Sequence, residues 1–222
     1  MRLSVTDRDD LVRRLAAAHV LAGSSLSFLE ELKVVVRHVD ARVSAPWYGS
    51  SVKDRGNYEE ALRTLEGRSI RSVAYYEIAY SDGTPMWSFD GEALDSLDFG
   101  LTLELDDGSL FSFDWGADFA PYGVRISTAS LQSGQHAREW DADQRWASLL
   151  AVPIVAVATW WLQAETREDP IDYPQAVRLR FASGDAVTIS ASEDRTGMMD
   201  HITVFFDEAE ARRMGFGFAE DG

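Results

Sequence analysis

Two stretches of this chain decide its fold: LTLELDDGSLFSF at residues 101–113 and VRLRFASGDAVTI at residues 177–189. In each stretch, apolar and polar side chains alternate on both sides of a glycine-containing turn, which is typical of a β-hairpin with one buried face. When Gly108 is placed on Gly184, apolar residues meet apolar residues and polar residues meet polar ones, as where Leu103 aligns with Leu179. We therefore interpret the two hairpins as copies of one duplicated unit.

The sequence around each hairpin extends the copies in the same order. In the first copy, a helix is predicted at residues 58–65, a β pattern begins at Ile70, and a last strand follows at residues 124–128. The second copy has a predicted helix at 143–150, a strand at 154–162 and a closing strand at 201–206. The offset between copies is 84 residues at Ile70 and Ile154 but 76 at the glycines, as expected if loops have changed length.

The N-terminal residues predict helices, because apolar side chains recur at helical spacing on both sides of a Gly23-Ser24-Ser25 break. The triplet Val34-Val35-Val36 favours a strand, so a partly extended segment stays open. We expect an α+β fold: N-terminal helices (1–56), followed by two similar helix-plus-antiparallel β-meander units packed together (57–131 and 132–222). A face-to-face sandwich and a single continuous sheet both fit the pattern, and the three segments can also form one compact domain.

Composition narrows the chemistry that this chain can perform. Its 222 residues are 45% hydrophobic and include no cysteine, which excludes disulfides, thiolate catalysis and zinc sites built on sulfur. The N-terminus has no apolar signal-like stretch, and the most apolar run, LLAVPIVAVATWWL at 149–162, is shorter than the roughly 20 residues that span a bilayer. We expect a cytoplasmic protein, and the excess of 19 Arg over 2 Lys suggests a bacterial source.

Charge is distributed unevenly along the chain. Residues 1–69 hold 11 basic and 10 acidic side chains, whereas residues 70–222 hold 10 basic and 27 acidic ones. Between Arg71 and Arg125 lie 11 carboxylates and no Lys or Arg. Such a surface repels nucleic acid and anionic lipid and attracts a basic protein, a basic peptide or a cation. A purely solubilising acidic surface is the simpler interpretation.

Motifs that carry catalysis or bind cofactors are missing from the sequence. The four histidines are separated along the chain and form no metal-binding pair, and neither a GxSxG elbow nor a phosphate-binding glycine loop occurs. Asp114 and Asp118 could form a catalytic pair or bind a divalent cation, but aspartates beside glycines are commoner in turns. We predict no cofactor, no metal site and no catalytic residue, and we favour a protein that is not an enzyme.

Aromatic side chains and carboxylates gather in the first copy, in a combination that suits recognition of a cationic partner. Phe111, Phe113 and Trp115 share one strand face and fit a core role. The predicted partner-binding residues are Trp87, Asp90, Asp95, Asp98, Asp114, Asp118, Phe119 and Tyr122.

Two functions fit these observations best, and a structural subunit of a larger assembly is a third interpretation. The first is a non-catalytic acidic binding protein that recognises a basic protein, most plausibly a bacterial immunity or inhibitor protein that neutralises a toxin. The alternative is an enzyme or small-molecule-binding protein with a pocket between the two β units, tested first at Asp114, Asp118, His136 and Arg138. No contact with nucleic acid or membrane is expected, and the sequence leaves the oligomeric state open.

Overall fold

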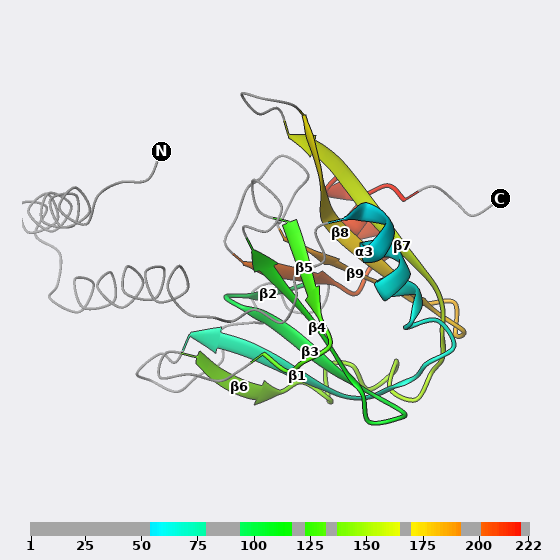
Figure 1. The fold of residues 1–222 in the computed structure, drawn as a ribbon. Coiled ribbons are helices and arrows are strands. Elements are labelled where there is room, and N and C mark those ends of the chain that lie inside the picture. The colour runs from blue at the N-terminus through cyan, green and yellow to red at the C-terminus, as the bar shows by residue number, and fades with distance from the viewer. Residues whose placement is uncertain are drawn as a thin grey trace, which may run out of the picture. The chain divides into compact units, whose positions relative to one another are not determined.

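The computed structural model describes residues 54–78, 94–116, 123–131, 137–164, 170–191 and 201–218, all within the compact unit Tyr48–Gly222. The predicted N-terminal helices fall on residues outside these ranges. The described elements are α3 (Arg55–Arg63), β1 (Ile70–Ile78), β2 (Leu94–Leu97), β3 (Gly100–Leu105), β4 (Leu110–Gly116), β5 (Gly123–Ser127), β6 (Ala137–Asp141), β7 (Ile154–Ala164), β8 (Ile171–Phe181), β9 (Ala186–Ser190), β10 (Ile202–Phe205) and α4 (Glu208–Arg213) (Figure 1).

The predicted α+β class is wrong, because the structure is mainly antiparallel β. Strands account for 54% and helices for 12% of the described residues. Two strands that the alternation pattern did not predict, β2 and β6, add to the sheets, and each has only four or five residues. Such short strands carry too few alternating positions to be separated from loops by their pattern.

The helix predicted at residues 143–150 is also wrong, and consecutive turns occupy this segment. Their backbone hydrogen bonds span either three or four residues: Arg145 N and Trp146 N both donate to Ala142 O, at 2.9 and 3.2 Å. Ala151, which follows, has a positive φ of 61°, and Pro153 lies two residues further on. These two residues end the turn before a regular helix can grow, because neither fits a continuing α-helix. In the first copy, the helix predicted at 58–65 corresponds to α3.

Each copy forms a four-stranded meander, and the two meanders lie in separate five-stranded sheets. The strand orders are β5-β4-β3-β1-β6 and β2-β10-β9-β8-β7. Registers match between them: Leu103 lies opposite Phe111 as Leu179 lies opposite Val187. Even an irregularity is repeated, because the register shifts between Ile70 and Ser72 in β1 and between the equivalent residues, Ile154 and Ala156, in β7. The equivalence drawn from the sequence therefore agrees with the strand pairing.

A short antiparallel bridge joins the starts of the two meanders. Ser69 pairs with Pro153, which are equivalent positions under the 84-residue offset. Gly67 N donates to Ile154 O, and Ala151 N donates to Ile70 O, both at 2.8 Å. Gly67 and Ala151 are equivalent residues, as are Ile70 and Ile154, so the second bond is the counterpart of the first. The bridge therefore lies on a local pseudo-two-fold axis.

The two sheets share one hydrophobic core. They therefore pack face to face as a sandwich and do not join into a single continuous sheet, the other arrangement that the sequence left open. Buried side chains from both meanders belong to the same cluster, including Leu101, Phe113, Val177 and Ile189. The segment that precedes each meander packs against the first strand of the other meander. Tyr58 of α3 packs edge-on against Trp161 of β7, with ring centroids 5.5 Å apart, whereas Trp146 of the 143–150 turn donates to the Tyr75 hydroxyl of β1 at 2.8 Å.

Equivalent turn positions in the two copies give a paired stability prediction. Gly67 has φ of 80° and Ala151 has φ of 61°, a region that costs a residue with a Cβ about 1–2 kcal/mol. We expect Gly67→Ala to lower the free energy of unfolding by about 1 kcal/mol. Ala151→Gly should raise it by roughly 0.5 kcal/mol, since relief of strain exceeds the added entropy of the unfolded chain. Urea unfolding measures both, and a change of the same sign in both variants would contradict the prediction.

Candidate functional site

The structure describes three of the eight predicted partner-binding residues: Asp95, Asp98 and Asp114. The other five lie outside the described residues: Trp87, Asp90, Asp118, Phe119 and Tyr122. His136, a residue of the enzyme alternative, lies outside them as well. Asp95 and Asp98 come together with Glu77 at the end of β1, and we call these three residues the carboxyl cluster. Asp114 lies on the outer face of the first sheet.

Asp95 is buried in β2 and is held by two side chains of the fold, Tyr75 and Arg145. Tyr75 donates its hydroxyl to Asp95 Oδ2 at 2.9 Å, and Arg145 Nε lies 3.1 Å from both carboxylate oxygens. Trp146 Nε1 donates in turn to the Tyr75 hydroxyl at 2.8 Å. Burial raises the pKa of Asp95, and the bonds from Arg145 and Tyr75 oppose that shift. This carboxylate therefore bridges β1, β2 and the 143–150 turn inside the molecule.

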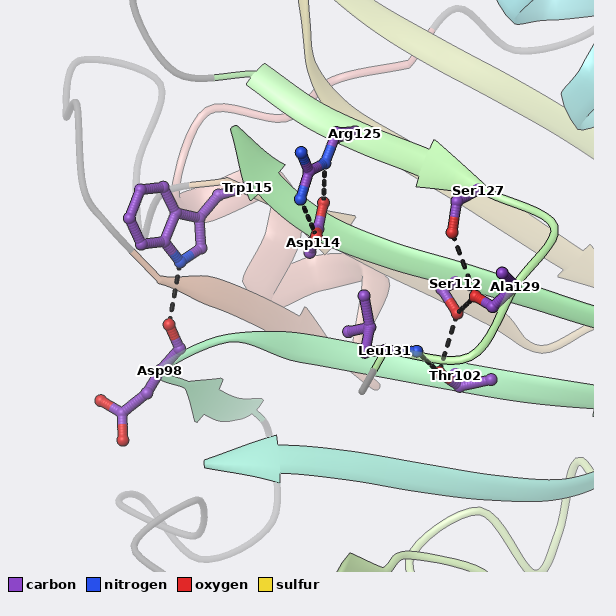
Figure 2. Close-up of polar contacts among 9 residues, drawn as sticks. All are labelled: Asp98, Thr102, Ser112, Asp114, Trp115, Arg125, Ser127, Ala129 and Leu131. Atoms are coloured by element: carbon purple, nitrogen blue, oxygen red, sulfur yellow. Dashed lines mark hydrogen bonds and ion pairs between the residues drawn. The ribbon is translucent and has the colours of Figure 1, made fainter. Parts of the chain in front are cut away.

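Asp98 fixes the position of the last residues of β1. Its Oδ2 accepts from the backbone N–H of Ile78 at 3.0 Å, and its backbone carbonyl accepts from Trp115 Nε1 at 2.8 Å (Figure 2). Asp98 thus links β1 to β4.

Glu77 is the most strongly perturbed ionisable group of the carboxyl cluster. It is 2% exposed, and its Oε1 atom has no hydrogen-bond partner among the described residues. Burial, followed by the nearby charge of Asp98, raises the pKa of Glu77 to about 10. At neutral pH Glu77 therefore carries a proton, because a further buried negative charge beside Asp98 and Asp95 would be costly.

Asp114 forms an ion pair with Arg125 across β4 and β5. Arg125 Nε donates to Asp114 Oδ1 at 2.7 Å, and its NH2 group contacts the second carboxylate oxygen (Figure 2). Next to this pair, Ser112 Oγ donates to Ala129 O at 2.6 Å and lies 2.8 Å from Thr102 Oγ1, so residues 128–131 cover the strand face. Asp114 is 6% exposed. Its carboxylate serves this internal pair, and contact with a partner stays a prediction.

Glu77, Tyr75, Arg145 and Trp146 were missed by the sequence-based prediction. The register shift near Ile70 places Val73, Tyr75 and Glu77 on the inward face of β1, opposite to Tyr76 and Ile78. The duplication could have revealed Glu77. Under the 84-residue offset, its equivalent in the second copy is Trp161, a large side chain that packs against the core, and this equivalence predicts that Glu77 is buried.

The carboxyl cluster does not have the features of a metal site. Among the described residues, no three His, Cys, Asp or Glu side chains are arranged to hold a metal ion. Arg138, the described basic residue of the enzyme alternative, lies on β6 with its guanidinium 5.2 Å from the centroid of the Trp140 ring. The hollow found between α3 and β7 is lined by Glu59, Leu62, Arg63, Val157, Ala158 and Thr159. A pocket between the two β units stays a prediction.

Comparison with known proteins gives no relative: no protein family, no curated protein and no solved structure matches this chain. In the described part of the chain, no helix is long and apolar enough to cross a membrane.

The protonated state of Glu77 predicts an unusual pH dependence of stability. The ordinary pKa of a glutamate is 4.5, whereas the pKa of Glu77 is about 10 in the folded chain. Between these values the unfolded state binds fewer protons, so stability falls as pH rises. Glu77→Gln removes this dependence, and its amide N–H can replace the hydrogen bond between the protonated Glu77 carboxyl and the Asp98 side chain. We expect the variant to gain stability over the native chain as pH increases, by at most about 1.4 kcal/mol per pH unit.

Urea unfolding of both proteins at pH 5 and pH 9 measures this difference. Glu77→Ala is the matched control, because it also removes the titratable carboxyl but leaves a cavity and no donor. A difference between Glu77→Gln and the native chain that stays constant from pH 5 to pH 9 would contradict a buried protonated carboxyl.

Proposed function

We propose that this chain is a non-catalytic acidic binding protein that recognises a basic protein, as a bacterial immunity protein recognises its toxin. The observation that carries the proposal is the charge distribution: the formal net charge is −16, and residues 70–222 supply 27 acidic against 10 basic side chains. A field of this sign accelerates the approach of a basic partner and disfavours nucleic acid.

The described surface of the first sheet supports this assignment. Arg71 and Arg125 each form an ion pair with a carboxylate of the same sheet, Glu104 and Asp114, so their charges are locally compensated. On β6, Glu139 and Asp141 are exposed to solvent. Both alternate outward on an edge strand, where a partner can approach them without displacing other elements.

The internal role of the buried carboxylates sharpens where a partner would bind. Asp95 and Asp114 are committed to Arg145 and Arg125, and Glu77 is protonated at neutral pH. Attraction of a basic partner therefore falls to the exposed carboxylates. Among the described residues of the first sheet, these include Glu139 and Asp141, whereas the exposed Asp106 and Asp107 in the turn after β3 are paired with Arg68.

Capture from the lysate of the native host tests the proposed function. The immobilised full chain should retain a discrete basic protein at low salt and release it at roughly 0.5 M NaCl, since screening weakens the attraction between exposed charges. Retention of acidic and basic proteins alike, or a bound protein that this salt concentration does not affect, would contradict the proposal.

Isosteric removal of exposed charge gives a second test with the captured protein. In Glu139→Gln combined with Asp141→Asn, the new amide oxygens still accept the bonds from the Tyr76 hydroxyl and Asp143 N–H. We expect association to slow by roughly two- to tenfold at low salt, with little change in dissociation. Asp185→Asn, in the turn between β8 and β9, is the control. Equal rates for the double variant and the native chain would show that β6 does not attract the partner.

A further inference from the structure

The outer edge of β7 has no strand paired with it in the described residues, whereas the equivalent edge of β1 in the first copy pairs with β6. β7 has eleven residues, IVAVATWWLQA, without one charged side chain, and it pairs with β8 on one side. In the described ranges, no strand pairs with its other side beyond the Ser69–Pro153 bridge. Natural proteins usually protect such edges with charges, prolines or a covering element, because an exposed edge pairs readily with another strand.

The equivalent edge in the first copy is covered, and it shows how a strand docks there. Asp143 Oδ1 accepts from Val73 N at 2.7 Å, and Ala142 N donates to Val73 O at 2.9 Å. β6 then continues antiparallel to β1, with Trp140 opposite Tyr75. The molecule therefore contains its own example of an added strand at this position.

A carboxylate also accepts from the equivalent backbone N–H of β7, although it belongs to Glu66 and not to Glu59, the equivalent of Asp143. Glu66 Oε1 accepts from Val157 N at 3.1 Å, and Val157 is the equivalent of Val73. Thr159 is the equivalent of Tyr75, where pairing with an added strand would begin. The residues that correspond to β6 are 53–57 under the 84-residue offset, and from Arg55 onward they belong to α3. In the first copy, the segment equivalent to β6 is therefore helical from Arg55 onward and does not form a strand at the edge of β7.

Helix α3 gives the edge of β7 a second wall. A hollow between them is lined by Glu59, Leu62 and Arg63 on the helix and by Val157, Ala158 and Thr159 on the strand. In Figure 1, α3 lies alongside β7. A groove with a strand edge on one side and a helix on the other is the geometry in which an extended peptide adds to a sheet.

Charge around the groove favours a basic occupant. On and beside α3, the guanidinium groups of Arg55 and Arg63 are paired with Glu59 and Asp172, and the same segment also carries Asp54, Glu60 and Glu66. Because the whole chain is also strongly negative, a basic segment is attracted here and a second copy of the chain is repelled.

We propose that the edge of β7 binds an extended basic segment of the partner protein as a sixth, antiparallel strand of the second sheet. The proposal rests on the proposed function and specifies the surface through which the partner binds. Thr159 supplies the first backbone donor. Its N–H points to the open edge, because it follows Val157 by two residues and the register shift in β7 comes only after Trp160.

A defined peptide probe tests this pairing without knowledge of the partner. The probe is an acetylated and amidated nine-residue peptide of alternating lysine and valine, titrated into the full chain and followed by fluorescence anisotropy. The same peptide with glutamate in place of lysine, and one with a central proline, are its controls. We expect binding of the lysine peptide alone, with slower hydrogen exchange in β7 around Thr159.

Two substitutions at one position separate backbone pairing from charge attraction. Thr159→Pro removes the outward donor and places a ring in the path of an added strand, but keeps the bonds to β8. Thr159→Val keeps the donor and the branched shape. We expect Thr159→Pro to weaken peptide binding at least about tenfold and Thr159→Val to leave it within about threefold. Circular dichroism and thermal unfolding confirm that each variant is folded.

Several results would overturn the proposal. They are absence of lysine-peptide binding, equal binding by Thr159→Pro and the native chain, and exchange protection confined to other strands. A dimer of the native chain that Thr159→Pro dissociates would assign the edge to a second copy instead. If the captured host protein still binds Thr159→Pro at native strength, the proposed function stands and this edge is not its surface; if no basic protein is captured, the function itself fails.

Discussion

The bridge between Ser69 and Pro153 is the constraint on which the other features of the fold depend. Hydrogen bonds from Gly67 and Ala151 hold the starts of β1 and β7 together. Each segment that precedes a meander is thereby directed over the first strand of the other meander. The exchange closes a common core at both ends, so neither half has a complete core of its own.

Function in such a molecule depends on how the two equivalent halves have diverged. On the outer face of the first sheet, Thr102 and Ser112 form a polar network with Ala129 and Leu131, and Asp114 is paired with Arg125. On the second sheet, the equivalent face is covered by α4 and the chain that follows it. Arg178 there contacts Glu208 at 3.0 Å and lies 4.8 Å from the centroid of the Phe218 ring. Arg178 is thus buried, with 6% of its surface exposed.

The sequence predicted the parts of the fold that repeat and failed where local patterns are short. The hairpins around Gly108 and Gly184 were predicted because long alternating stretches surround each turn. β2 and β6 were missed, since their pairing with β10 and β1 is decided by distant strands rather than by their own residues.

The candidate site was predicted only in part, for a related reason. Acidic residues were assigned to the surface from their charge alone, yet Asp95 finds Arg145 and Tyr75, which lie 50 and 20 residues away in the chain. Burial of a carboxylate depends on such remote partners, which composition and spacing do not reveal. The register shift near Ile70 had a similar effect, because one extra residue reverses which side chains of β1 face the core.

The proton held by Glu77 has a calorimetric consequence. At neutral pH the folded chain keeps this proton, with a pKa of about 10, whereas an unfolded glutamate has released it. Unfolding near neutral pH therefore discharges a proton into the solvent, and the buffer takes it up. The heat measured for unfolding then includes the ionisation enthalpy of the buffer, so it differs between phosphate and Tris although the protein and the pH are the same.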